Sequence, residues 1–433
     1  MLSFPSASAA ALTVAAGGLL TATTLTTSLA QQAPAQAPAA QPAPAAAPTA
    51  PPAWKQGMPA SMATSPLAPH ATPMTVTPPE KIPVDKIKVP AGFKVELWAH
   101  GMPGARMMAR GPKGTIFVGT RAIGRVYAIS EKEGKREHRI VAQGLTQPNG
   151  VAVRDGSLYV AAINKVLRYD DIEDRLDNVP EPVDLTEAFK LPPDQHHGWK
   201  FLAFGPDGKL YVPIGAPCNV CEINPGTHGQ IRRYNPDGSG MEIVARGVRN
   251  SVGFDFHPVT KELWFTDNGR DWMGDDGPQE ELNRVPAESV GANFGYPYCH
   301  ARGIADQDIK RPNPCAGVVR PAALLGPHAA ALGLRFYTGD MFPAAYKNSA
   351  FIARRGSWNR AQKFGYDVVV AKPAGDSATV KPFMTGFLDS KDNTYWGRPV
   401  DVLQMQDGSL LVSDEHNGAI YRVSYSKQDL SSR

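Results

Sequence analysis

Six similar units follow one another between residues 93 and 425, and this repetition constrains the fold more than any other feature of the chain. Each unit contains an apolar strand, a turn with glycine and a second apolar strand, and apolar and polar residues alternate within it as in β-strands. Equivalent positions in the six second strands are Phe117, Leu158, Leu210, Leu263, Phe351 and Leu410. Repeats that stack on their neighbours in this way are typical of β-propeller blades. The sequence therefore predicts an all-β fold, a six-bladed β-propeller, with an open array of β-sandwiches as the alternative.

The chain around the repeats divides into three parts. Residues 9–30 are apolar or small and end in Ser-Leu-Ala, as secretory signal peptides do, although a positively charged start is missing. Residues 31–80 are dominated by Ala, Pro, Gln and Thr, a composition that buries too little to order a chain. We therefore expect a signal peptide over 1–30, a disordered Ala/Pro-rich linker over 31–80 and the propeller over 81–433, in a periplasmic protein. An uncleaved membrane anchor is the alternative to the signal peptide. The strand-like segment at Phe93 is expected to join the last blade and so close the ring.

Charge and hydropathy exclude two classes of protein. The chain has 45 Lys and Arg against 41 Asp and Glu, and its basic residues are scattered without a run that could follow a phosphate backbone. The mean hydropathy of −0.28 excludes a multi-span membrane protein. We therefore expect no nucleic-acid partner and no stable membrane insertion of the mature protein.

The four cysteines, Cys218, Cys221, Cys299 and Cys315, all lie in the repeat region. An even number of cysteines in an exported chain favours disulfides. We prefer the local pairing, Cys218 with Cys221 and Cys299 with Cys315, over the two other connectivities. A zinc site made of the four thiolates is the alternative, but the second pair is spaced too widely for a usual zinc motif.

Polar residues gather where the repeated strands begin or end, and in a propeller these loop ends converge over the central channel. They are Gln195-His196-His197, Gly247-Val248-Arg249-Asn250, Asp267-Asn268-Gly269-Arg270, the run Arg354 to Arg360, and the single residues Arg121 and Arg398. Each of them alone could be a solvated turn residue or part of a salt bridge between blades. Because like charges repel unless an anion lies between them, their recurrence on several blades favours a polyanionic ligand.

Several of these motifs, taken in order, resemble the glucose/sorbosone dehydrogenase family. They are HHGWKFLAFGPDGKLYVPIGA, RGVRNSVGFDFHP, LWFTDNGRD and GRPVDVLQMQDGSLLVSD, and the similarity covers about residues 85 to 425. The segments GAPCNVCE and RGSWNR are closer to the sorbosone branch. Members of the family are soluble six-bladed quinoproteins that use pyrroloquinoline quinone (PQQ), so the resemblance implies the same fold and cofactor.

The resemblance also assigns the reacting groups. It implies that His197, eight residues before Gly205, is the general base. It places Arg249 and Asn250 beside the quinone, where Arg249 would stabilise negative charge on the quinone oxygen. It further implies that calcium is held by the backbone carbonyls of Gly269 and Arg270, and a hard cation prefers such oxygen ligands.

The remaining cofactor contacts are arginines. PQQ carries three carboxylates, which cationic side chains bind with charge-assisted hydrogen bonds. Arg121, Arg398 and either Arg354 or Arg355 are the expected contacts. The last blade departs from the family, which can carry a second arginine where this chain has Val400.

The predicted function is a periplasmic PQQ- and calcium-dependent dehydrogenase that oxidises an aldose, sorbosone or a related sugar or aldehyde by hydride transfer to the quinone. Electrons would leave to a quinone or cytochrome acceptor. No Gly-x-Gly-x-x-Gly motif opens a strand–helix unit, so a nicotinamide or flavin site is not supported. One alternative is a calcium-dependent, lactonase-like hydrolase, which would need acidic side chains around the channel metal; the other is a non-enzymatic binding propeller.

Overall fold

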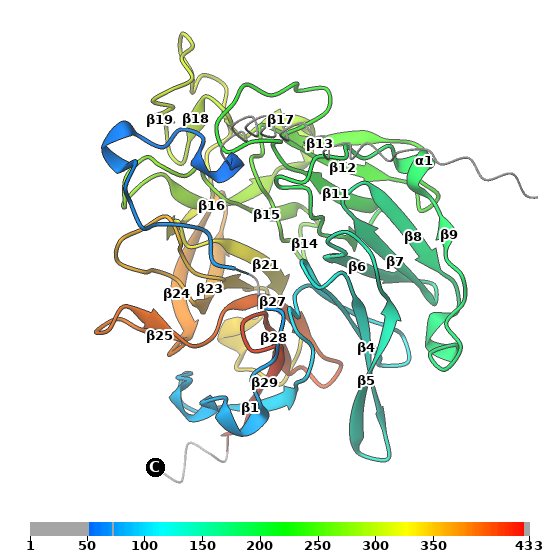
Figure 1. The fold of residues 1–433 in the computed structure, drawn as a ribbon. Coiled ribbons are helices and arrows are strands. Elements are labelled where there is room, and N and C mark those ends of the chain that lie inside the picture. Colours follow the sequence, from blue (N-terminus) through cyan, green and yellow to red (C-terminus); the bar gives the residue numbers. More distant parts are fainter. Residues whose placement is uncertain (1–51, 72, 428–433) are drawn as a thin grey trace, which may run out of the picture. The chain divides into compact units, whose positions relative to one another are not determined.

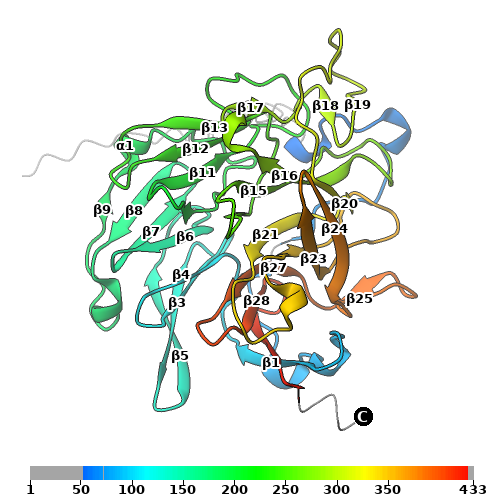
Figure 2. The ribbon, with the colours of Figure 1, turned by 180° about the vertical axis from the view of Figure 1, so that it is seen from behind.

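The computed structural model describes residues 52–71 and 73–427, so the predicted signal peptide and the first part of the predicted linker lie outside the described residues. The described chain forms six sheets arranged in a ring, each with four antiparallel strands and one of them with a fifth, parallel strand, as Figures 1 and 2 show from opposite sides. The predicted all-β, six-bladed β-propeller is therefore confirmed.

The blades follow the order of the chain. Blade one contains β2 (Met108–Arg110), β3 (Ile116–Gly119), β4 (Val126–Lys132) and β5 (Lys135–Ala142). Blade two contains β6 (Gly150–Arg154), β7 (Ser157–Ala162), β8 (Lys165–Tyr169) and β9 (Val183–Asp184). Blade three contains β10 (Ala203–Phe204), β11 (Leu210–Ile214), β12 (Gln230–Tyr234) and β13 (Glu242–Arg246), to which β17 (Ala292–Asn293) adds in parallel.

The second half of the ring is built in the same way. Blade four contains β14 (Phe254–Phe256), β15 (Leu263–Asp267), β16 (Gln279–Val285) and β20 (Ala323–Pro327). Blade five contains β21 (Ala331–Phe336), β22 (Ala350–Arg354), β23 (Asp367–Ala374) and β24 (Ser377–Met384). Blade six contains β27 (Pro399–Gln404), β28 (Leu410–Asp414), β29 (Ala419–Tyr425) and β1 (Phe93–Ala99).

The remaining elements are short. Two hairpins lie outside the blades, β18 (Cys299–His300) with β19 (Ile304–Ala305) and β25 (Leu388–Asp389) with β26 (Thr394–Tyr395). The helices are α1 (Thr186–Phe189) and the 3₁₀ turns η1 (Ala53–Lys55), η2 (Ala60–Met62), η3 (Pro79–Lys81), η4 (Val84–Lys86), η5 (Ile172–Asp174), η6 (Ala287–Ser289) and η7 (Ala344–Tyr346). None of these described helices has the length and apolar character that a membrane span requires.

The ring closes through its first strand. β1 pairs antiparallel with β29, with Phe93 opposite Tyr425. Strands from the two ends of the repeat region therefore share one blade, as expected from the FKVELWA segment. Because β1 comes from the start of the repeat region and its three partner strands from the end, the pairing ties the two ends of the ring together.

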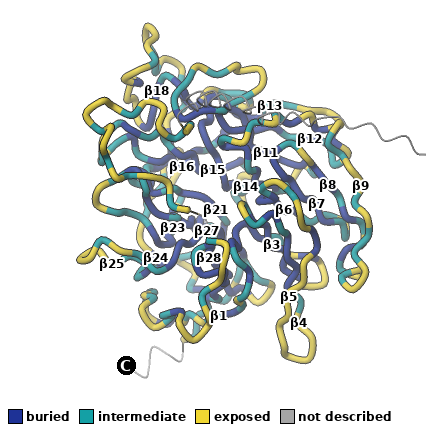
Figure 3. The backbone as a smooth tube through the Cα atoms, in the orientation of Figure 1, coloured by how far each residue is buried: buried dark blue, intermediate teal, exposed yellow. Residues whose placement is uncertain are grey.

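The core lies between the blades and is built mainly from their second strands, which run as dark bands through the ring in Figure 3. The six equivalent positions predicted from the repeats all lie in second strands and are all buried: Phe117, Leu158, Leu210, Leu263, Phe351 and Leu410. Every residue of β11, β15, β22 and β28 is buried. Strands covered on both faces read as nearly continuous apolar runs, as these do.

Both expected disulfides are present. Cys218 and Cys221 are joined with their Cα atoms 6.0 Å apart, and Cys299 and Cys315 with theirs 5.1 Å apart. The second bridge links the β18–β19 hairpin to the rest of the excursion between β16 and β20. The thiolate zinc site is therefore excluded, because no described cysteine is free.

The segment before β1 differs from the expectation of a disordered linker. Residues 52–71, here called the N-terminal strap, cross the face of the propeller turned to the viewer in Figure 1, where they are blue. The strap is held by specific hydrogen bonds: the Trp54 carbonyl accepts one from Trp272 Nε1 at 2.7 Å, and His70 Nε2 lies 3.1 Å from the hydroxyl of Tyr366. Its composition could not reveal these contacts, because each of them depends on a single side chain.

Candidate active site

A cavity of about 450 Å³ opens over the central channel, between the loops that join the blades. This volume is typical of small-molecule sites. The residues that line it include, from the predicted set, Arg121, His197, Arg249, Asn250, Gly269 and Arg355. Five loops far apart in the sequence therefore deliver their polar ends to one place, as the propeller topology requires.

His197 lies in the cavity wall, and its surroundings define its protonation. Its Nδ1 is 3.0 Å from the carbonyl of Ala216, which can only accept, so Nδ1 carries the proton and Nε2 holds the lone pair. Gly215 allows this approach, because a Cβ at that position would lie 2.6 Å from the Cβ of His197. Burial, together with the charges of His196 and Arg249, holds the pKa of His197 well below its usual value. The ring is therefore neutral at pH 7, as a general base must be.

His196 packs against His197, with ring centroids 4.1 Å apart and an interplanar angle of 55°. Burial and then the charges of Arg249 and Arg121 lower the pKa of His196 to about 4. Trp199 meets the His197 ring edge to face with centroids 5.9 Å apart, and the guanidinium of Arg121 lies 3.6 Å from the centroid of that indole. This packing restricts the positions that the His197 ring can take.

Arg249 is held on three sides. Its guanidinium donates to the carbonyls of Asn268 and Gly269 at 3.0 and 2.7 Å, and to Asn219 Oδ1 at 2.7 Å. Asn219 is fully buried in the loop closed by the Cys218–Cys221 disulfide. The disulfide loop therefore orients a predicted catalytic arginine, a role that the spacing of the two cysteines did not reveal.

Three arginines gather around a single buried carboxylate, Glu415, and a fourth arginine lies near them. Glu415 is fully buried and forms ion pairs with Arg106 and Arg355, and Arg398 Nη1 lies 3.9 Å from it. Burial alone would raise the pKa of Glu415, but the charges of Arg355, Arg106 and Arg398 outweigh it and hold the carboxyl ionised. The fourth arginine is Arg121, whose pKa falls to about 9 because it is buried and close to Arg106 and Arg355.

This cluster retains excess positive charge and an unused donor. Arg398 Nη1 is buried without a hydrogen-bond partner among the described residues. A buried donor without a partner costs about 1–3 kcal/mol, so such groups are usually satisfied by a ligand or water. The geometry therefore fits an anion with several carboxylates.

Two acidic residues, Asp271 and Glu280, line the cavity together with Gly269. The Glu280 carboxylate accepts hydrogen bonds from the backbone N–H groups of Gly269 and Ala330 at 3.0 and 3.2 Å. Burial raises the pKa of Glu280 well above its usual range and also raises that of Asp271. A divalent cation at this place would relieve that cost, and carboxylate oxygens are the ligands that calcium prefers.

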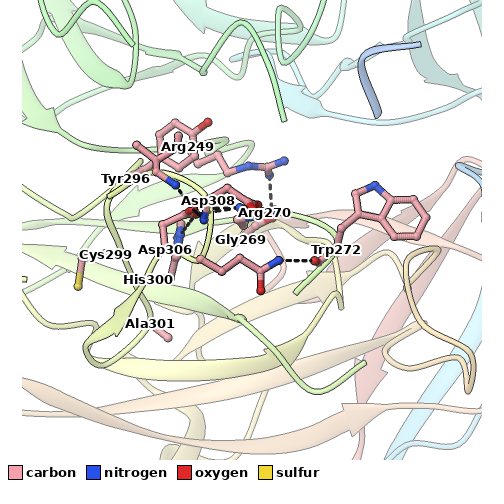
Figure 4. A network of polar contacts seen from close by, with 12 residues as sticks. Arg249, Gly269, Arg270, Trp272, Tyr296, Cys299, His300, Ala301, Asp306 and Asp308 are labelled. Carbon is pink, nitrogen blue, oxygen red and sulfur yellow. Dashed lines mark hydrogen bonds and ion pairs between the residues drawn. The ribbon is translucent and has the colours of Figure 1, made fainter. Parts of the chain in front are cut away.

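Three predicted site residues, Arg270, Arg354 and Arg398, do not line the cavity. The Arg270 side chain is fully buried and pairs with Asp306 and Asp308 at 3.0 and 2.8 Å, in the network that Figure 4 shows. Arg354 pairs with Asp367 through two hydrogen bonds of 2.7 and 2.6 Å. Val400 is fully buried in the main apolar cluster. Of the two alternatives Arg354 and Arg355, the structure brings only Arg355 to the cavity.

Sequence reasoning missed Arg106, Asp271, Glu280 and Glu415. Arg106 stands just before the first strand of its blade, and Glu415 just after the second strand of the last blade. These are the same loop ends at which the predicted residues stand, so the rule that found Arg121 and Asn250 applies to them as well. Glu280 had no such signal, because it lies inside β16.

The lowered pKa of His196 predicts an effect on stability. In the unfolded chain histidine titrates near about 6.5, so below that pH the unfolded state binds more protons than the native state, and stability falls with pH down to the native pKa of about 4. We expect the free energy of unfolding of the wild type to fall, relative to that of His196→Asn, by about 1–2 kcal/mol between pH 7 and pH 5. Urea unfolding at the two pH values measures this, with Gln195→Asn as the non-titrating control. Parallel pH dependences of wild type and His196→Asn would contradict the prediction.

Comparisons with known proteins agree on the fold. A family model described as TrAA12-like matches residues 87–426. An uncharacterised protein of Borreliella burgdorferi is 34% identical over 354 residues, covering 79% of this chain and 91% of that protein.

Two solved structures are similar at low sequence identity. The calcium structure of a Trichoderma reesei enzyme of carbohydrate-active enzymes family AA12 has a TM-score of 0.69 at 19% identity, covering 81% of this chain and 100% of that one. The holo form of the pyranose dehydrogenase PQQ domain from Coprinopsis cinerea has a TM-score of 0.63 at 18% identity, covering 78% of this chain and 97% of that one. At such identities the likeness shows that the fold is shared.

Proposed function

The chain belongs to the TrAA12-like family, and from this premise we propose that it is a PQQ- and calcium-dependent dehydrogenase that oxidises a sugar or a related aldehyde. The observation that carries the proposal is one cavity that joins a neutral histidine, His197, to a group of arginines with a single carboxylate between them. The solved structures of similar fold support it, since one is described as a pyranose dehydrogenase PQQ domain and another as a calcium structure.

The arginines would hold the cofactor. Arg121 and Arg355 line the cavity and would donate charge-assisted hydrogen bonds to carboxylates. Arg106 also lines it, although Glu415 neutralises its charge, and Arg398 lies outside the lining with Nη1 unpaired in the described chain. Gly269, Asp271 and Glu280 would hold the calcium ion, which is a change from the predicted pair of Gly269 and Arg270. When bound, PQQ would supply the acceptor for a hydride and calcium the positive charge beside it.

The protein's own groups would move the proton. Nε2 of His197 would take the proton of the substrate hydroxyl, because Nδ1 is already used in the bond to Ala216. Arg249 would stabilise negative charge that develops nearby, and its bonds to Asn219 hold it in place before reaction. Asn250 lines the same cavity beside Arg249.

The proposal also includes the cellular compartment and the electron acceptor. Two disulfides favour an oxidising compartment such as the periplasm. A quinone or cytochrome would take the electrons, and sorbosone is one candidate substrate.

The test is reconstitution. We expect the purified apoprotein to reduce a soluble dye in the presence of a sugar or aldehyde only when both PQQ and calcium are added. A panel of aldoses, sorbosone and simple aldehydes identifies the substrate. The Arg355→Ala variant should need a higher PQQ concentration for half-maximal rate, whereas Arg354→Ala, whose side chain pairs with Asp367, serves as the matched control. Absence of PQQ-dependent dye reduction across the panel would overturn the proposal.

A calcium-dependent hydrolase is the second candidate, and one observation favours it. A hydrolase of this kind needs acidic side chains around the channel metal, and Asp271 and Glu280 line the cavity. The same preparation should therefore be assayed for lactone hydrolysis with calcium and without PQQ. Hydrolysis under these conditions, with no dye reduction, would favour the second candidate.

A further inference from the structure

The N-terminal strap forms part of the cavity wall. Ala53, Trp54, Pro69 and His70 line the same cavity as His197 and Arg249, although more than 120 residues separate them from His197 in the sequence. We propose that the strap belongs to the active site and that Trp54 is a substrate-contacting residue that favours ring-shaped sugars. The inference rests on the proposed function and assigns a specificity role to a segment whose composition resembles a linker.

The ring of Trp54 is held in place by two other indoles. It stacks on Trp272 with centroids 6.3 Å apart and an interplanar angle of 28°, and it meets Trp358 edge to face at 5.7 Å. Trp272 also donates its Nε1–H to the Trp54 carbonyl at 2.7 Å. A side chain fixed in this way loses little conformational freedom when a ligand packs against it, which favours binding.

The strap is tied to the catalytic arginine as well. The carbonyl of Gln56 accepts a hydrogen bond from Asn219 Nδ2 at 2.6 Å, and its side-chain oxygen accepts one from the Asn219 backbone N–H at 3.0 Å. Asn219 in turn binds Arg249 through its side-chain oxygen. These bonds fix the position of Trp54 relative to the reacting groups, so the strap acts as a rigid wall.

The residues that line the cavity have the chemistry to bind a ring-shaped sugar. Trp54 and Trp358 contribute flat apolar surfaces, whereas Gln195, His197 and Arg249 contribute polar groups to the same cavity. A pyranose has C–H groups on its faces and hydroxyls around its edge, so it can use both kinds of surface at once. An open-chain alditol with the same hydroxyls has no flat face, and it gains less from an indole.

The test compares three aldopyranoses (glucose, galactose and xylose) with their alditols in the wild type, Trp54→Ala and Trp54→Leu. Leucine keeps apolar bulk, and both variants keep the backbone carbonyl that binds Trp272. Binding is measured by calorimetry on protein saturated with calcium and previously reduced PQQ, in which no turnover occurs. We expect Trp54→Ala to bind the preferred pyranose about tenfold more weakly, the effect of losing roughly 50 Å² of apolar contact. Trp54→Leu should also bind it more weakly than the wild type, because leucine has no flat face. Affinity for the alditol should change less than twofold.

Met74→Ala is the matched control, since Met74 is 59% exposed in the same part of the chain and does not line the cavity. It should bind every sugar as the wild type does. If PQQ does not bind, the proposed function fails by itself, and the calorimetry is then carried out on the apoprotein with the same comparison. The inference is overturned if no pyranose binds better than its alditol, or if both Trp54 variants keep wild-type affinity for every pyranose.

Discussion

His197→Ala is expected to lower kcat by about 10²–10⁴-fold while the protein still binds PQQ and calcium, because this is the usual contribution of a positioned general base. The side chain lies in the cavity wall with Nδ1 committed to the Ala216 carbonyl, so Nε2 is the nitrogen that can accept a proton. The groups proposed to bind the cofactor, Arg121, Arg355 and Arg398, do not contact His197 through any hydrogen bond of the described chain. Steady-state kinetics and an absorbance titration with PQQ measure the two quantities separately.

The neighbouring histidine is the control for this experiment. His196 packs against His197 but has no hydrogen-bond partner at its Nε2 in the described part of the chain. His196→Ala should therefore lower kcat much less than His197→Ala does, and only because the His197 ring is packed more loosely. Near-normal turnover in His197→Ala with PQQ demonstrably bound would remove the proposed mechanism and strengthen the interpretation as a binding propeller.

Glu415→Gln is expected to lower the free energy of unfolding by about 3–5 kcal/mol, the cost of removing one partner from a buried ion pair. The variant leaves the buried Arg106 and Arg398 and the partly exposed Arg355 together without an anion between them. Glutamine keeps the shape of the side chain, so the loss reports the charge. Urea unfolding at pH 7 measures it.

A surface ion pair provides the matched control. Asp376→Asn removes a carboxylate that pairs with Arg284, but the Asp376 side chain is 91% exposed, and exposed pairs contribute about 0–1 kcal/mol. If the cavity holds a polyanion, added PQQ should raise the Tm of Glu415→Gln more than that of the wild type, because the unpaired arginines gain an anionic partner. A stability loss no larger than that of Asp376→Asn would contradict the assignment of Glu415 as the centre of the arginine group.

The architecture could be predicted because it depends on local pattern repeated along the chain. Alternating apolar residues define strands, and the positions equivalent to Phe117 recur in each blade and are buried in each. The closing strand at Phe93 followed from the same pattern. Loop ends of successive blades must converge over the channel, so the sequence alone placed His197, Arg249 and one of the pair Arg354 and Arg355 at one site.

Individual side-chain directions depended on the tertiary structure. Arg354 and Arg355 are adjacent in the sequence, but successive side chains leave a strand on opposite sides, and only the fold shows that Arg354 meets Asp367 while Arg355 meets Glu415. In the same way, the acidic partners of Arg270 lie on the excursion after β17, 36 residues or more along the chain. No local pattern encodes such a pairing.

The N-terminal strap shows most clearly the difference between what the sequence pattern predicts and what the tertiary structure decides. The sequence determined that residues 31–80 are poor in apolar periodicity, and composition of this kind predicts disorder because little surface can be buried by the segment itself. The tertiary structure decided that Trp54, Gln56 and His70 find partners already built by the propeller. The strap is stabilised by a surface that exists only after six blades have closed into a ring, and for that reason the sequence alone could not show that the strap lines the cavity.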